Sequence, residues 1–348
     1  MIKLFKNQPP EILVPEPPPA VEMLSFQPLP GFSSPHAQTV LAYLTPIGSS
    51  PPSTPLIVPI GDGSSLCCEV STPKSWHKSQ STIVLVHGLG GSHSSSYMVR
   101  LSRKLYEMGL RAVRVNMRCC GSGSELAKIP YHGGLSGDIL AVLNKLKEET
   151  PDSAIILVGF SLGGNIALKL SAELGLSNNK LIETTIAICP SIDLAETAEI
   201  LSQPANHIYN RYYMRQLEAI VNKNKSNYSF ATIYEFDRII TAPNWGFKSP
   251  EEYYRQSSSR YLLSHIQTPC HILLAIDDPF INHLSCLNVP RSSSVKVWLS
   301  EYGGHVGFFG WADSEHRYYW LDSILIKWIK EAISSEPNKQ HIAGETKR

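Results

Sequence analysis

The sequence lacks a long apolar run. No window approaches the roughly 18 uninterrupted apolar residues of a membrane-spanning helix. The first 20 residues, MIKLFKNQPPEILVPEPPPA, are interrupted by Pro, Glu and Asn, so they contain no continuous apolar segment of the kind found in a secretory signal. We expect neither a signal peptide nor a transmembrane segment, which leaves peripheral contact with a membrane open.

A surplus of charge of one sign is also lacking. The chain has 31 Lys and Arg residues against 30 Asp and Glu residues, a net charge of +1. Such a balance provides no strong field for attracting nucleic acid or an anionic membrane surface. Nucleic acid is therefore not expected as a partner, and nothing in the composition indicates an oligomeric state.

Cysteine usage gives little support to disulfides or zinc. The seven cysteines are odd in number, include two adjacent pairs and form no C-x-x-C motif. This is a poor disulfide framework for a chain of 348 residues and a poor pattern for zinc ligands. A reducing compartment is the simplest interpretation, so a cytoplasmic location is expected.

Strands and helices alternate along most of the chain. Strands are predicted over 81–88, 111–118, 153–160, 182–189, 270–276 and 295–300. Helices are predicted over 95–109, 133–149, 161–175 and 316–335. This alternation is typical of an α/β protein with a mainly parallel sheet and helices on both faces.

Three segments interrupt this pattern. Residues 1–55 are rich in Pro and Ser and read as an extended arm with one short helix near 36–44. Residues 191–266 contain no clear strand, which predicts a helical insertion over the carboxyl ends of the strands, where ligands bind in open α/β sheets. Residues 336–348 are polar and are expected to be disordered.

The insertion contains an aromatic and basic cluster, YNRYYMRQ, at 209–216. Such a cluster could contact an acyl chain or an anionic headgroup. Packing within a solvent-facing cap is the simpler interpretation.

Gly159-Phe160-Ser161-Leu162-Gly163 has the form G-x-S-x-G. It lies where an apolar strand is expected to end and a helix to begin, which is the setting of a nucleophile elbow, although ordinary glycine-rich turns share the letters. The glycines allow a tight turn that would lift the serine hydroxyl above the sheet. The amino end of the helix would offer the Leu162 N–H to a developing oxyanion. We predict that Ser161 is a catalytic nucleophile.

A second oxyanion donor is expected in the loop after an earlier strand. VHGLGG, residues 86–91, follows such a strand, so we assign the Leu89 N–H to this role. His87 lies in the same loop and could be mistaken for a base. Packing and orienting the loop is the simpler interpretation of this histidine.

The base and the acid are expected near the carboxyl end of the chain. EYGGHVGFFG, residues 301–310, follows the last predicted strand, and its paired glycines would present His305. AIDDPF, residues 275–280, follows the preceding strand and offers Asp277 and Asp278. The order Ser, Asp, His matches that of α/β hydrolases.

The adjacent aspartates leave alternatives open. Pro279 biases Asp278 toward an extended backbone that suits a loop acid, yet an Asp before Pro can also cap a helix and leave Asp277 as the acid. A metal site built on both carboxylates lacks histidines at a recognisable ligand spacing. Because serine and histidine chemistry needs no metal and no organic cofactor, none is expected.

Several motifs resemble one known family, the YheT-like branch of the α/β-hydrolase superfamily, with its abhydrolase-domain lipases and embryogenesis-associated plant proteins. The resemblance is carried by GFSLGGN (159–165), VHGLGGS (86–92), AIDDPFI (275–281) and GGHVGF (303–308). It is extended over about residues 25 to 335 by FSSPHAQT (32–39), YHGGLSGDI (131–139) and NWGFKSPEEYYRQSSS (244–259).

The resemblance implies an α/β-hydrolase fold over residues 56–335, with a cap inserted at 191–266. It also favours Asp278, because the acid of such enzymes commonly lies three positions after a small residue, here Ala275. One position departs from the family. Cys119 stands where its turn usually has glycine, and we expect this change to affect the wall of the site.

Residues and resemblance together predict a serine hydrolase that cleaves carboxylic esters through an acyl-enzyme, of the carboxylesterase or lipase type. Its triad would be Ser161, Asp278 and His305, and its substrate a small-molecule or lipid ester. The alternatives are a phospholipase or an acyltransferase acting on lipid esters. A non-catalytic binding protein is a further alternative, although no triad residue is missing.

Overall fold

The structure is a computed structural model that describes residues 21–44, 48–222, 227–312 and 318–335. The predicted tail at 336–348 lies outside the described residues, as do the first 20 residues of the predicted arm and the first two of the helix predicted over 316–335.

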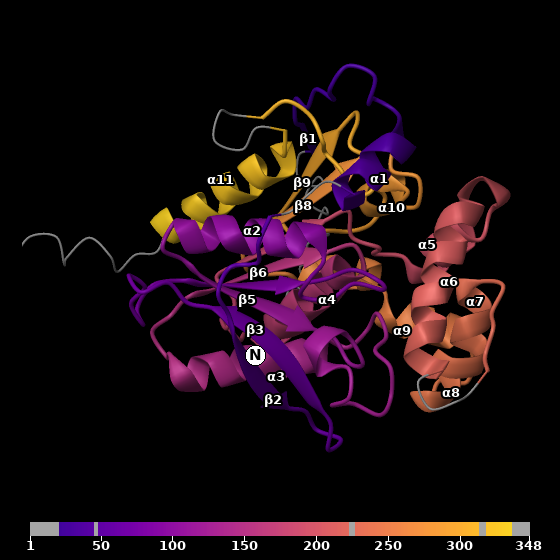
Figure 1. Cartoon of the computed structure of the whole chain (residues 1–348), viewed down its shortest axis with the longest axis horizontal. Coiled ribbons are helices and arrows are strands. Elements are labelled where there is room, and N and C mark those ends of the chain that lie inside the picture. Colours follow the sequence, from indigo (N-terminus) through magenta and orange to yellow (C-terminus); the bar gives the residue numbers. More distant parts are fainter. Residues whose placement is uncertain (1–20, 45–47, 223–226, 313–317, 336–348) are drawn as a thin grey trace, which may run out of the picture.

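The described residues form a nine-stranded sheet with the order β1-β9-β8-β7-β6-β4-β5-β3-β2 (Figure 1). In this order, the neighbouring strands from β1 to β5 are joined by six parallel pairings. Two antiparallel pairings then add β3 to β5 and β2 to β3. The strands are β1 (Val21–Met23), β2 (Thr54–Pro59), β3 (Ser65–Ser71), β4 (Thr82–Val86), β5 (Arg111–Asn116), β6 (Ile155–Phe160), β7 (Thr184–Ile188), β8 (Cys270–Ala275) and β9 (Val295–Ser300).

Helices cover both faces of the sheet (Figure 1). Side chains of α3 and α4 pack on one face, and those of α2 and α11 pack on the other. The core helices are α2 (Ser96–Glu107), α3 (Ser136–Glu149), α4 (Leu162–Leu176) and α11 (Trp320–Ser334). Strands β4 to β7 are buried along their whole length, which explains why they read as continuous apolar runs.

Between β7 and β8 the chain forms a group of several helices in place of one crossover helix, and this group stands beside one end of the sheet (Figure 1). Its α-helices are α5 (Leu194–Leu201), α6 (His207–Val221), α7 (Ile233–Phe236), α8 (Ala242–Asn244) and α9 (Pro250–Ser257). A π-helical turn, η4 (Asp237–Thr241), links α7 to α8. Outside this group, α1 (Pro35–Leu44) precedes β2 and α10 (His283–Leu287) precedes β9.

The six predicted strands and five predicted helices are confirmed, with shifts at their ends. Three strands were not predicted. β1 has only three residues, and all of them are exposed, so it carries no apolar pattern. β2 contains two prolines, which are tolerated because it is an edge strand, and β3 pairs with it as an antiparallel hairpin.

Candidate active site

Ser161 lies in a strained turn between β6 and α4. Its backbone has φ 52° and ψ −116°, a conformation that is costly for a residue with a side chain. Phe160, the last residue of β6, is fully buried, and Leu162 begins α4, so the turn is held between two packed elements. The G-x-S-x-G segment thus adopts the strand-turn-helix geometry expected from its sequence.

Glycine is required on the helical side of this turn. A Cβ added to Gly163 would lie 2.5 Å from the carbonyl oxygen of His87 and still closer to that of Val86. Real Cβ atoms do not approach oxygen so closely. The absence of a side chain at Gly163 therefore lets α4 start directly against the end of β4.

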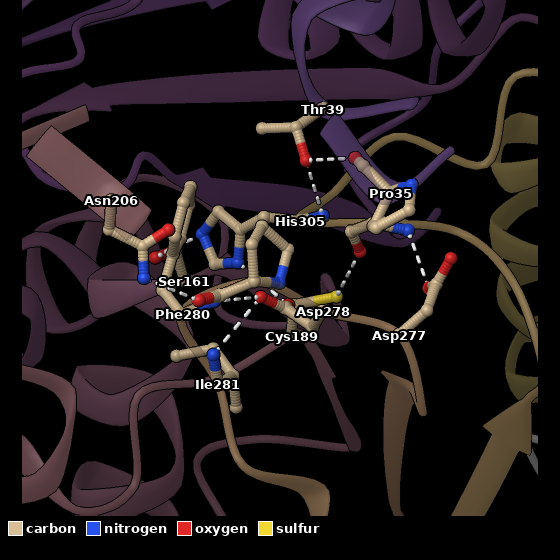
Figure 2. Close-up of polar contacts among 12 residues, drawn as sticks. Pro35, Thr39, Ser161, Cys189, Asn206, Asp277, Asp278, Phe280, Ile281 and His305 are labelled. Atoms are coloured by element: carbon tan, nitrogen blue, oxygen red, sulfur yellow. Dashed lines mark hydrogen bonds and ion pairs between the residues drawn. The ribbon is translucent and has the colours of Figure 1, made fainter. Parts of the chain in front are cut away.

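Three side chains from three loops form one hydrogen-bonded chain (Figure 2). His305 Nε2 lies 2.8 Å from Ser161 Oγ, and His305 Nδ1 lies 2.8 Å from Asp278 Oδ2. Because a carboxylate only accepts hydrogen bonds, Nδ1 is the donor to Asp278, which leaves Nε2 free to accept the serine proton. The side chains of His305 and Asp278 are 6% and 0% exposed, so water does not separate them.

The second carboxylate oxygen of Asp278 is held by its own loop. Oδ1 accepts hydrogen bonds from the backbone N–H groups of Phe280 and Ile281 at 2.9 and 3.0 Å. The insertion supports the same loop, because Asn206 donates to the carbonyl oxygen of Pro279 at 2.9 Å. Phe280 then packs its ring against the imidazole of His305, with centroids 4.5 Å apart.

Asp277 points to the backbone of the histidine loop. Its Oδ1 accepts a hydrogen bond from the Gly304 N–H at 2.9 Å. Burial raises the pKa of Asp277 above its ordinary value, and the N–H groups of Gly304 and Gly303 partly offset this rise. Of the two adjacent aspartates, Asp278 is therefore the one that contacts the imidazole.

Helix α1 holds the histidine loop from the opposite side (Figure 2). The Thr39 hydroxyl accepts a hydrogen bond from the His305 N–H at 2.9 Å and donates to the Pro35 carbonyl at 2.8 Å. Gln38 is fully buried; it donates to the Phe309 carbonyl and accepts from the Phe309 N–H. The sequence predicted the helix but not these contacts, although HAQT is among the segments that carry the family resemblance.

The loop after β4 places Leu89 beside Ser161. The N–H groups of its neighbours Gly88 and Gly90 already donate to the Tyr97 and Tyr131 hydroxyls, at 3.0 and 2.7 Å. Leu89 and Leu162 both line a cavity that contains Ser161. Leu89 follows β4 and Leu162 follows β6, so both residues lie at the carboxyl ends of parallel strands.

His87 is fully buried in this loop. It contacts the Gly88 carbonyl through Nδ1 and accepts a hydrogen bond from the Met117 N–H through Nε2. Burial lowers the pKa of His87 to about 4, so the imidazole stays neutral at physiological pH. Its contacts are those of a residue that orients the loop.

Two cavities meet at Ser161 and His305. One is a smaller, mainly apolar cavity of about 70 Å³ that extends from Ser161 to residues of α5, α7 and α9. The other is an open cleft of about 570 Å³ between α1, α6 and the serine-rich loop after β4. A bound molecule could therefore extend to both sides of the serine hydroxyl.

Cys119, at φ 61° in the region that favours glycine, is not among the described residues lining either cavity.

In the aromatic and basic cluster of the insertion, residues 209–216, some side chains line the cavities and others face solvent. Tyr213 lines both cavities, and Tyr209 lines the open cleft, where its hydroxyl contacts His36 Nδ1 at 2.9 Å. Arg211 and Arg215 are exposed on the other side of α6. The tyrosines thus belong to the site, and the arginines face solvent.

Cys189, Asp278 and His305 are a candidate metal set, because one ligand atom from each lies within 4.8 Å of the others. Two of the three already bond to each other, and burial together with the Asp278 charge raises the pKa of the Cys189 thiol well above its ordinary value. A thiol must lose its proton to bind a metal, so this set fits a metal poorly.

The chain matches a family model described as the alpha/beta hydrolase fold over residues 81–232. Est1E from Butyrivibrio proteoclasticus has a similar structure, with a TM-score of 0.52 and 14% sequence identity, and the alignment covers 82% of this chain and 100% of that one. The fold is that of an α/β hydrolase.

Proteins with similar sequences indicate the family to which the chain belongs within this fold. YheT of Escherichia coli (strain K12), described as a candidate esterase, is 31% identical over 89% of this chain and 94% of its own. A monoacylglycerol lipase of Saccharomyces cerevisiae is 26% identical over 75% of this chain and 65% of its own. The chain belongs to the YheT-like family of abhydrolase-domain proteins. In its described residues no helix is long and apolar enough to cross a membrane.

The crowding at Gly163 predicts a loss of stability. Gly163→Ala should lower the free energy of unfolding by about 1–3 kcal/mol, because the new methyl group must displace the end of β4. Gly137→Ala is the matched control: it lies in α3 with open space around the added Cβ and should raise stability by about 0.5–1 kcal/mol. Urea unfolding of both variants measures the difference. Equal stability of the two would contradict the predicted crowding.

Proposed function

We propose that the protein is a serine hydrolase that cleaves carboxylic esters through an acyl-enzyme on Ser161. The observation that carries this proposal is the continuous hydrogen-bonded chain from Ser161 through His305 to Asp278 at the junction of two cavities. A nucleophile, a base and a group that orients the base are the elements that such a reaction requires.

The reaction follows from the donor and acceptor roles in this chain. Ser161 Oγ attacks the ester carbonyl carbon while its proton passes to His305 Nε2. Asp278 stays ionised and stabilises the resulting imidazolium through the Nδ1–H bond. His305 then gives the proton to the leaving alcohol oxygen as the carbon–oxygen bond breaks. In the second half, water loses a proton to His305 and attacks the acyl-enzyme; His305 then returns this proton to Ser161 Oγ as the bond from Oγ to the acyl carbon breaks and the acid is released.

The negative charge that develops on the carbonyl oxygen needs two fixed donors. We assign these to the backbone N–H groups of Leu89 and Leu162. Leu162 is the first residue of α4, so its N–H has no acceptor within the helix and lies at the positive end of the helix dipole. Donors fixed before the reaction stabilise the charge without reorganisation.

Thr39 is assigned as a positioning residue. Its hydroxyl joins the backbone of His305 to that of Pro35, so α1 determines the height of the imidazole above Ser161. Gly304 packs against the same helix so closely that a Cβ there would lie 2.8 Å from the Thr39 hydroxyl. A small displacement of the base is expected to slow proton transfer strongly.

A small-molecule or lipid ester is the substrate class that the two relatives favour, because one is described as a candidate esterase and the other as a monoacylglycerol lipase. Phospholipase and acyltransferase activities on lipid esters are the alternatives within the enzyme class. A non-catalytic binding protein is less well supported, since no member of the hydrogen-bonded chain is missing. Cytoplasmic location remains a prediction from cysteine usage.

Labelling of the nucleophile tests the proposal. A fluorophosphonate probe should modify the native protein at one residue, Ser161, and Ser161→Ala should abolish both labelling and turnover of nitrophenyl esters. Ser202→Ala, an exposed position outside both cavities, serves as the matched control and should label normally. Full esterase activity in Ser161→Ala would contradict the proposed nucleophile.

The adjacent aspartates should differ greatly in their effect on turnover. Asp278→Asn keeps the shape of the side chain but favours the wrong imidazole tautomer, so kcat should fall by about 10⁴-fold. Asp277→Asn removes only a contact to the Gly304 N–H and should reduce kcat by less than about tenfold. Steady-state kinetics of the two variants make the comparison, and a larger loss at Asp277 would reverse the assignment.

Replacement of Thr39 should slow the chemical step without unfolding the protein. Thr39→Val keeps the shape but removes the hydroxyl, and we expect kcat to fall about 10- to 100-fold with little change in KM or melting temperature. Thr39→Ser retains the hydroxyl and should restore most of kcat. A purely structural role predicts instead that melting temperature and kcat fall together, with no rescue by serine.

A further inference from the structure

The smaller cavity beside Ser161 has a wall of mixed chemistry. Most of the wall is apolar and comes from the insertion, with Leu194, Leu201, Leu217 and Phe236 among its residues. Buried polar side chains interrupt this surface, and those of Ser191 and Asp237 are among them. A cavity meant only for a plain alkyl chain has no use for either group, because burying a polar group is costly.

Ser191 carries the stronger signal. It is 3% exposed, and its Oγ is a buried atom with no hydrogen-bond partner among the described residues. Its backbone N–H donates to the Ser161 carbonyl at 3.4 Å, and both residues line the same cavity. A buried hydroxyl without a partner in the protein costs free energy unless a bound molecule satisfies it.

Asp237 adds a second polar group to the same wall. It lies in the π-helical turn η4 and is 6% exposed. It accepts hydrogen bonds from the Thr241 and Tyr254 hydroxyls at 2.6 and 2.8 Å, and neither of these partners is a cation. Burial raises the pKa of Asp237 to about 7, and the two hydroxyl bonds partly offset this rise.

The volumes of the two cavities can be compared with the acyl group and the alcohol group of an ester. A water-sized group needs about 10–15 Å³ of such volume. The smaller cavity of about 70 Å³ therefore suits a short group better than a long acyl chain. The open cleft of about 570 Å³ can release a leaving alcohol directly to solvent. An arrangement that fits both volumes places the acyl group in the smaller cavity and the alcohol in the open cleft.

We propose that the smaller cavity binds a short acyl group that carries a hydroxyl within a few atoms of the carbonyl carbon, with Ser191 as its hydrogen-bond partner. This inference rests on the proposed ester hydrolysis at Ser161 and names the acyl group of its substrate. A hydroxyl suits the wall because it can accept a hydrogen bond from Ser191 and donate one in turn. Ser191 acts here as a specificity-determining residue.

Nitrophenyl 3-hydroxybutyrate and nitrophenyl 3-methylbutyrate are the matched probes, because they differ only by a hydroxyl in place of a methyl group. Both enantiomers of the hydroxy ester are used, with the 3-amino and dodecanoyl esters for comparison. We expect kcat/KM of the native protein to favour one hydroxy ester over its methyl analogue by about three- to tenfold, the value of one neutral hydrogen bond. In Ser191→Ala this ratio should fall to about one.

Ser323→Ala is the matched control variant. Its Oγ is also buried without a partner among the described residues, but it lies on α11 and lines neither cavity. This variant should keep the native ratio. Because removal of an unpaired hydroxyl leaves no new group unsatisfied, Ser191→Ala should retain the native melting temperature.

Three results would overturn the inference: a native ratio of one or less, a ratio unchanged in Ser191→Ala, or a preference for the dodecanoyl or 3-amino ester. If Ser191 only held a water molecule, its loss would change both esters equally and leave the ratio unchanged. A different failure is recognisable in the same assay. If no ester is hydrolysed, or if turnover persists in Ser161→Ala, the proposed function itself is wrong, and this inference with it.

Discussion

The site depends on the parallel alignment of β4, β6, β7, β8 and β9. Because the carboxyl ends of parallel strands meet at one edge of the sheet, the loops that follow them converge there. Ser161, Asp278 and His305 each follow a different strand of this set, and hydrogen bonds of 2.8 Å join them. The strained backbone of Ser161 is tolerated because β6 and α4 are buried on either side of it.

Segments outside the sheet then fix the orientation of these loops. Helix α1 holds the histidine loop through Gln38 and Thr39, and the insertion holds the acid loop through Asn206. These contacts explain why the arm and the insertion belong to the site although neither supplies a member of the hydrogen-bonded chain. The insertion also forms most of the wall of the smaller cavity beside Ser161.

The sequence predicted the parts of the structure that leave a local pattern. Apolar runs indicated the core strands, and the G-x-S-x-G spacing indicated the turn at Ser161. The choice of Asp278 over Asp277 depended on family resemblance, because neighbouring acids look alike until their contacts are known. The bond between Thr39 and His305 joins residues 266 positions apart, and the isolation of the Ser191 hydroxyl depends on what surrounds it in three dimensions. No local pattern encodes either feature.

The central claim is that Ser161 forms a covalent acyl-enzyme. Its most direct test is the mass of the intact protein quenched in acid during turnover of a short nitrophenyl ester, followed by peptide mapping. The account predicts a mass increase equal to one acyl group, located on Ser161, together with a burst of nitrophenol that approaches one equivalent of enzyme. Turnover of the ester with an acyl group on another residue, or with activity retained in Ser161→Ala, would contradict it.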